Sequence, residues 1–271
     1  MSLRMENLSI LKQIDLASRY LQLISDAGYK LIDLNMVEPF KVENKQFHPD
    51  SIVFERNQQL FALRSDWTRS ILNYNNAFQL SQQKFGYFGP VIRQGKTYYH
   101  AGVELFQPSM SEMVASVHLH FEFIEDLLDV PFTVVVVNND ILLDMYIDLY
   151  NLEADIKPLV IDKNLSKLKE NLGEDHPFYQ LMIVPVSQQF ALVNEQFGDS
   201  EPMQMIHSLR DSLSNTETRF ILDLSFRSPQ RYYNGFYFQA FLGGNTAVLS
   251  GGQYAEGAFG IGVNLSSGGL L

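Results

Sequence analysis

The apolar positions of this chain follow helical spacing in some stretches, and short β-branched or aromatic runs in others. Near the start, apolar side chains recur every three or four residues until Gly28, which predicts a helix that ends there. Later runs are bounded by Gly, Pro and Asn, which predicts strands. The predicted helices cover residues 9–27, 66–76, 111–128 and 139–150, and the predicted extended segments or strands cover residues 30–40, 51–63, 85–106, 132–137, 220–226, 235–242, 246–250 and 259–265.

These elements predict an α+β fold in which helices flank an antiparallel sheet. Residues 152–215 carry mostly helical patterns that are broken by Gly and Pro, and they predict a small helical insertion. From residue 219 onward the short strands predict an antiparallel meander. We therefore expect one domain over residues 1–271, with the insertion inside it.

The segment FGYFGPVIRQGKTYYHAGVELF, residues 85–106, predicts a hairpin with a long loop. Arg93 ends its first strand and Glu104 lies inside its second strand. A guanidinium that faces a carboxylate across a sheet can bind a zwitterion such as an amino acid, or a nucleotide phosphate. The same two residues can also form an ordinary cross-strand ion pair on a solvated face, so both interpretations stay open.

Composition narrows the classes of function. The 271 residues are 46% apolar, which suits a packed domain, yet no apolar run reaches the ~20 residues of a membrane span. The N-terminus has no secretory pattern, so we expect a cytoplasmic protein. There is no cysteine, and the six histidines lack metal-ligand spacing, so we expect no metal and no cofactor. A net charge of −11 without a Lys/Arg cluster argues against a nucleic-acid partner.

Four segments occur in the order found in the histidyl-tRNA synthetase family: LRSDWTRSI at residues 63–71, the hairpin, RYYNGFYFQAF at 231–241 and LSGGQYAEGAFGIGVNL at 249–265. The chain resembles the catalytic core of that family, which has the class II aminoacyl-tRNA synthetase fold. The resemblance is weakest over the insertion. It implies a homodimer, because the first helix and the next extended segment match the family's dimer motif. A synthetase continues into an anticodon-binding domain, which we do not expect after Leu271.

Carried over position by position, the resemblance implies a pocket for histidine but no catalytic residue. Its members would be Asp66, Thr68, Arg93, His100, Glu104, Tyr232 and Tyr233. The two carboxylates would receive amino or imidazole N–H groups, and Arg93 would hold a carboxylate or a phosphate. Asp66 can instead be only a helix cap. Tyr232 and Tyr233 can be ordinary strand aromatics on opposite faces, so that at most one of them faces the pocket.

Several positions depart from the family pattern. Ser65 replaces a proline, Ser228 stands in place of a catalytic arginine with Arg227 one position away, and GGQYA replaces GGRYD, which brings in Gln253 and Ala255. No Lys or Arg follows Gln253. Adenylate chemistry needs cations to stabilise charge on phosphates, so these losses argue against catalysis.

The chain accordingly resembles the regulatory subunits of ATP phosphoribosyltransferase, a family similar to a synthetase core without aminoacylation activity. That resemblance implies a short-form catalytic phosphoribosyltransferase as partner, within a larger hetero-oligomer of histidine biosynthesis. It also implies support of catalytic activity and allosteric feedback inhibition by histidine. Two alternatives stay open: a truncated synthetase-like enzyme that adenylates a small carboxylate, and a scaffold without a working pocket.

Overall fold

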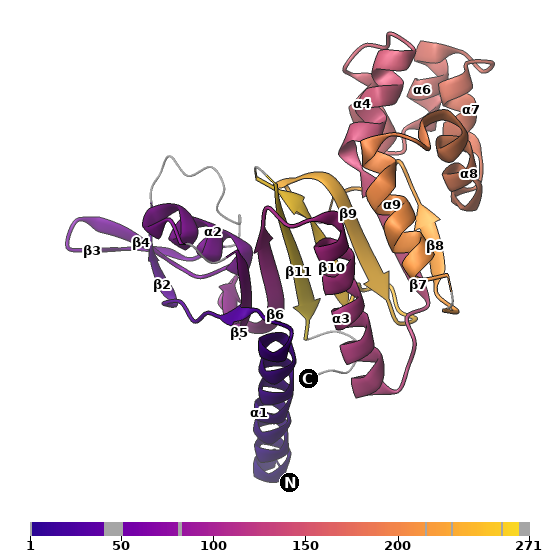
Figure 1. Ribbon diagram of the computed structural model, residues 1–271. Helices are drawn as coiled ribbons and strands as arrows, with labels where there is room; N and C mark the ends of the chain where they lie inside the picture. The colour runs from indigo at the N-terminus through magenta and orange to yellow at the C-terminus, as the bar shows by residue number, and fades with distance from the viewer. Residues whose placement is uncertain are drawn as a thin grey trace. The chain divides into compact units, whose positions relative to one another are not determined.

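The computed structural model describes residues 2–40, 51–80, 83–214, 216–228, 230–255 and 257–265, with side chains from residue 10 onward. The chain divides into two compact units, and each is described by itself (Figure 1). Unit 1 comprises Met1–Pro108, Thr246–Leu249 and Gly257–Leu271, and unit 2 comprises Ser109–Asn245 and Ser250–Glu256.

Unit 1 carries the first half of the elements and the last strand. They are α1 (Ser2–Asp26), β1 (Lys30–Leu31), β2 (Val37–Pro39), β3 (Val53–Arg56), β4 (Gln59–Leu63), α2 (Trp67–Phe78), β5 (Lys84–Arg93), β6 (Lys96–Phe106) and β11 (Ala258–Asn264). Strands β1, β5, β6 and β11 are neighbours in that order, and β2, β4 and β3 form a separate antiparallel sheet. The predicted first helix and the predicted strand pair at residues 51–63 are confirmed.

The β5–β6 hairpin is longer and its turn is tighter than the sequence predicts. The strands pair from Lys84 with Leu105 to Arg93 with Lys96, so only Gln94 and Gly95 form the turn. Both have positive φ, 49° and 74°, as a two-residue hairpin turn of type I′ requires. The prediction of a long loop is therefore wrong. Glu104 pairs with Phe85 and not with Arg93, so the cross-strand ion pair is wrong as well.

The core of unit 1 lies where α2 packs on this hairpin. The Trp67 ring stacks on Tyr87 with centroids 4.8 Å apart, and the Arg64 guanidinium lies 3.5 Å from the centre of the Trp67 ring. The Trp67 indole N–H donates to the carbonyl of Gly89 at 3.2 Å. A Cβ at Gly89 would lie 2.7 Å from the Trp67 ring, so the glycine allows this close approach.

Unit 2 carries the remaining elements. They are α3 (Met110–Leu128), β7 (Val134–Asn139), α4 (Asp140–Leu149), α5 (Ile156–Ile161), α6 (Leu165–Leu172), α7 (Pro177–Ile183), α8 (Val186–Phe197), α9 (Glu201–Ser212), β8 (Arg219–Leu222), β9 (Tyr233–Phe241) and most of β10 (Leu249–Tyr254). Strands β10, β9, β7 and β8 are neighbours in that order. Asn139, at the end of β7, caps α4 by accepting the N–H of Ile141 at 3.1 Å.

The strand pairings are mixed, not purely antiparallel as predicted. β1 runs parallel to β5, and β8 runs parallel to β7, whereas β5–β6, β6–β11 and β7–β9 are antiparallel. Because β8 lies beside β7, it is not part of an antiparallel meander that begins at residue 219. Parallel neighbours need a crossover connection, and helices α4–α9 supply it between β7 and β8.

Helices α4–α8 gather at one end of unit 2 (Figure 1). Their core forms around Tyr146, whose ring centre lies 5.4 Å from that of Phe178 and 4.7 Å from that of Phe197. Tyr146, Phe178 and Val193 are each under 4% exposed, so these helices bury an aromatic core of their own. Within the ranges described above, no helix combines the length and apolarity that crossing a membrane demands.

Candidate functional site

Glu104 is a carboxylate without solvent exposure in the middle of β6. Its Oε1 accepts a hydrogen bond of 2.5 Å from the hydroxyl of Thr68, in the first turn of α2. A Cβ at Gly260, the residue opposite Glu104 on β11, would overlap its Oε2. A buried carboxylate is costly unless it is hydrogen-bonded, so Thr68 and the bare backbone at Gly260 together permit Glu104 here.

Asp66 and Arg93 meet at the N-terminus of α2. Asp66 caps the helix by accepting the N–H of Arg69 at 3.0 Å, which confirms the predicted cap. Arg93 donates its Nε–H to the carbonyl of Ser65 at 2.8 Å, and its Nη2 lies 3.8 Å from Oδ2 of Asp66. The Arg93 side chain stays 22% exposed. The guanidinium is therefore fixed in direction and still open to solvent.

His100 lies within electrostatic reach of these two charges. Burial lowers its pKa to about 4, the Arg93 guanidinium acts in the same direction, and the Asp66 carboxylate opposes the shift. The imidazole is therefore neutral near pH 7 and can offer one donor and one acceptor. Unit 1 thus brings together five of the positions that the resemblance implies: Asp66, Thr68, Arg93, His100 and Glu104.

Tyr232 and Tyr233 belong to unit 2. Tyr232 lies in the turn before β9, so the prediction that both tyrosines are strand residues is wrong, and the alternation of strand faces does not apply to this pair. Their rings meet edge to face at 5.2 Å, and Tyr254 lies 5.8 Å from Tyr232. Tyr233 packs against the bare backbone of Gly252, where a Cβ would lie 2.8 Å from the ring.

The residues at and beside the positions of the family's cations are used by the fold of unit 2. The Ser228 hydroxyl donates to the carbonyl of Gln230 at 2.6 Å. Arg227 forms an ion pair with Asp162 on the surface. The Oε1 of Gln253 accepts the backbone N–H of Phe236 at 2.9 Å. Arg227, the one cation among these three residues, is thus engaged within its own unit.

Two residues of the site have roles that the sequence does not reveal. The sequence shows Ser65 only as a departure from the family pattern, yet its carbonyl orients Arg93 and its hydroxyl accepts from Arg69 at 3.0 Å. Glycines in this part of the chain are typical of turns and strand crossings, yet Gly260 makes room for Glu104. The alternation of glycines in GAFGIGV is a usable signal, because residues two apart on a strand share one face.

The comparisons with known proteins place the whole chain in a family. The family model described as Histidyl-tRNA synthetase matches residues 10–270. A relative named ATP phosphoribosyltransferase regulatory subunit, from Staphylococcus aureus (strain MRSA252), is 28% identical over 271 residues, which cover 96% of this chain and 98% of the relative.

Solved structures agree on the fold. An ATP phosphoribosyltransferase regulatory subunit/histidyl-tRNA synthetase from Bacillus halodurans C aligns with a TM-score of 0.76 and 17% identity, over 95% of this chain and 78% of the other. The ATP phosphoribosyl transferase (HisG:HisZ) complex from Thermotoga maritima aligns with a TM-score of 0.68 and 16% identity, over 93% of this chain and 97% of the other. The predicted class II synthetase-like α+β fold is confirmed, with the strand pairings mixed. This chain belongs to the histidyl-tRNA synthetase family.

Proposed function

We propose that this chain is the regulatory subunit of an ATP phosphoribosyltransferase in histidine biosynthesis. In that role it assembles with a short-form catalytic subunit, supports its activity and carries feedback inhibition by histidine. The observation that carries the proposal is the alignment with the Staphylococcus aureus regulatory subunit, which runs over nearly the full length of both chains.

The geometry of unit 2 supports a role without catalysis. Transfer of an adenylate needs cations that stabilise charge developing on the phosphates. The positions that hold arginines in the family carry Ser228 and Gln253, whose side chains hydrogen-bond within the fold. Arg227 is paired with Asp162, both largely exposed, at 69% and 59% of the side chain. These three groups serve the structure of unit 2.

The cluster in unit 1 supports binding of an amino-acid zwitterion. Thr68 donates its only hydroxyl proton to Glu104, so its oxygen is left to accept a hydrogen bond from an ammonium group. Arg93 keeps guanidinium N–H groups beyond the one bound to Ser65, and these suit a ligand carboxylate. Glu104 acts from beneath, because it has no exposed surface. We therefore assign histidine to this cluster, and the part of Tyr232 and Tyr233 in the pocket rests on the resemblance alone.

Three finer features belong to the same proposal. The chain forms a homodimer inside a larger hetero-oligomer, in line with its match to the family's dimer motif. It does not bind nucleic acid, since its net charge is −11 and its Lys and Arg residues are scattered. The assembly works in the cytoplasm, in line with an N-terminus that lacks a secretory pattern.

Reconstitution tests the proposal. The chain is added to a short-form catalytic phosphoribosyltransferase, and turnover is measured with and without histidine. We expect faster turnover with the chain, and inhibition by histidine only in the complex. An ATP–pyrophosphate exchange assay on the chain alone tests the alternative, a truncated synthetase-like enzyme that adenylates a small carboxylate. Exchange above background, or no effect on the catalytic subunit, would overturn the proposal.

The histidine site has its own test. Calorimetry compares histidine binding to wild type, Glu104→Ala, and Glu55→Ala, which removes an exposed carboxylate of β3. Loss of the charge-assisted bond that fixes Thr68 should weaken binding by about 1.5–3 kcal/mol, roughly ten- to a hundred-fold. Glu55→Ala should bind as wild type does. If the Glu104→Ala complex keeps the wild-type response to histidine, regulation runs through another surface.

A further inference from the structure

Two cavities in unit 2 flank the C-terminal end of α8, and none of the site residues described above lines them. One cavity, of about 500 Å³, is largely apolar and is lined by Tyr146, Tyr150, Leu181, Val184 and Leu192, among others. The other, of about 580 Å³, is polar and is lined by Asn194, Asp199, Ser200 and His207, among others. Glu195 and Gln196 line both cavities, so the two are adjacent. We call these two cavities and their rim the α8 surface.

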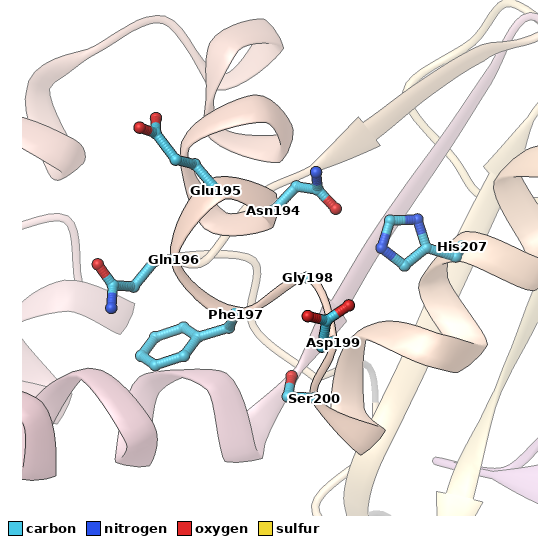
Figure 2. Close-up of a pocket in the computed structure, with 8 residues that line it drawn as sticks. All are labelled: Asn194, Glu195, Gln196, Phe197, Gly198, Asp199, Ser200 and His207. Carbon is cyan, nitrogen blue, oxygen red and sulfur yellow. The ribbon is translucent and has the colours of Figure 1, made fainter.

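The polar side of the α8 surface is formed by the end of α8, the residues that connect it to α9, and His207 of α9. Figure 2 shows Asn194, Asp199 and His207 on one side of the helix end, with Gln196 and Phe197 on the other. In the part of the chain that the structure describes, no hydrogen bond or ion pair engages the carboxylates of Glu195 and Asp199. Both residues are exposed. These two carboxylates are available to a cation from outside.

The apolar side of the α8 surface carries exposed hydrophobic residues. Leu192 lines the apolar cavity and is 38% exposed. Ile183 and Val186, which are close in sequence to the lining residue Val184, are 43% and 38% exposed. Tyr150 and Tyr146, whose rings stack 6.3 Å apart, form an aromatic wall. Exposed apolar side chains around a preformed groove are typical of a protein-binding surface.

Carboxylates outnumber cations around the α8 surface, where Arg210 of α9 lies with its guanidinium 4.0 Å from the Phe190 ring of α8. From Glu170 to Leu209 the chain has no Lys or Arg, and it has six carboxylates: Glu170, Glu174, Asp175, Glu195, Asp199 and Glu201. Of these, Glu174 is neutralised by Lys169, at 2.7 Å. A surface of this kind attracts a basic partner and repels an acidic one.

We propose that the α8 surface docks a basic amphipathic segment of the catalytic phosphoribosyltransferase subunit. An apolar side chain of that segment fills the cavity beside Leu192, and Lys or Arg side chains reach Glu195 and Asp199. This inference rests on the proposed function, and it names the place where the two subunits meet. Charge also argues against a second copy of this chain as the occupant, because each copy carries a net charge of −11 and the same carboxylate-rich surface.

Binding to the short-form catalytic subunit, measured by calorimetry with the full-length chain, tests the proposal. Leu192→Asp removes the apolar contact, and Glu195→Lys reverses the charge. Leu165→Asp is the matched control for the first, because Leu165 is also 38% exposed but lies on α6 outside both cavities. Glu153→Lys, an exposed carboxylate elsewhere in unit 2, is the control for the second.

We expect each α8 variant to weaken binding at least ten-fold, and the controls to stay within about two-fold of wild type. Raising the salt concentration should shrink the Glu195→Lys effect and leave the Leu192→Asp effect. If Leu192→Asp does not fold, as judged by its melting curve, Leu192→Ala and Glu195→Gln replace the pair, with several-fold losses expected.

The outcomes distinguish failure of the docking surface from failure of the proposed function. Wild-type chain that does not bind the catalytic subunit refutes the proposed function itself. Wild-type chain that binds, with both α8 variants binding equally well, refutes the docking surface and leaves the proposed function standing. A change in the mass of the isolated chain on Leu192→Asp, by light scattering, would show that a second copy occupies the surface and would also refute the proposal.

Discussion

Replacing Gly260 by alanine tests whether Glu104 depends on the bare backbone of β11. The new methyl group would occupy the place of Oε2 of Glu104. Gly262 is the matched control, because it lies two residues further along β11, on the same face. At Gly262 the nearest atom to an added Cβ is the Tyr87 hydroxyl oxygen, at 3.9 Å, which is ordinary contact.

The size of the effect follows from two costs. Forcing a methyl group into a packed interior costs about 1–3 kcal/mol. Displacing Glu104 also weakens its bond to Thr68, and a charge-assisted bond is worth about 1.5–3 kcal/mol. The two costs overlap, so we expect Gly260→Ala to lower the free energy of unfolding by roughly 2–4 kcal/mol. Gly262→Ala should instead gain about 0.5–1 kcal/mol, because alanine restricts the unfolded chain.

Thermal and denaturant unfolding of both variants gives the comparison. For a chain of this size, the melting temperature of Gly260→Ala should fall by on the order of 10 °C, and that of Gly262→Ala should hold or rise slightly. The same methyl group should cost far less in a Glu104→Ala background, where it fills vacated space. Equal losses in the two backgrounds would refute the reasoning, because the methyl group would then act on something other than Glu104.

Four further predictions concern stability, activity and assembly. Burial lowers the pKa of His120 to about 4, so between pH 7 and pH 5 this residue becomes protonated in the unfolded state but stays neutral in the folded state. Unfolding free energy should therefore drop by about 2 kcal/mol over that range on account of this residue, and His120→Gln should flatten the slope in denaturant titrations. Ala255 has φ 47°, so Ala255→Gly should raise the free energy of unfolding by about 1 kcal/mol, whereas Ala258→Gly in β11 should lower it. The pure chain should not charge tRNA with histidine in an aminoacylation assay, and charging above background would contradict the interpretation of Ser228 and Gln253. Light scattering at micromolar concentration should give the mass of a dimer, and a monomer would count against the dimer motif.

Local patterns predict most helices and strands, because their signals lie within a few residues. Asp66 before an apolar run predicts the start of α2, and Asn139 predicts that of α4. The turn of the hairpin is harder to predict because Gly89 and Pro90 resemble a break in the strand. Both lie inside β5, where Gly89 admits the Trp67 ring and the Pro90 carbonyl accepts from Arg64 at 3.1 Å. The roles of Gly89 and Pro90 depend on tertiary contacts, so no local sequence pattern reveals them.

In the candidate site, too, some residues can be predicted from the sequence and others only from the structure. Arg93 and Glu104 stand out because isolated charges in a strand-rich segment are conspicuous, and the resemblance supplies Asp66 and Thr68. The role of Ser65 depends on where the Arg93 and Arg69 side chains end, which the sequence does not specify. Strand register is also required to see that Gly260 faces Glu104. Residues that make room for, or orient, a functional group are therefore harder to find than the group itself.

The packing of unit 2 depends on Gln253, which stands where the family has an arginine. Gln253 accepts the N–H of Phe236 next to Gly235, which has φ 130° and lies where a Cβ would come within 2.7 Å of the Gln253 Oε1. An arginine has no acceptor, so at position 253 it would leave that N–H without this bond, at about 1–3 kcal/mol. A larger side chain would also press on the bare backbone of Gly235. Restoring the cation would therefore weaken the contact between β9 and β10, so the packing of unit 2 favours a binding and regulatory role over that of a synthetase with a damaged site.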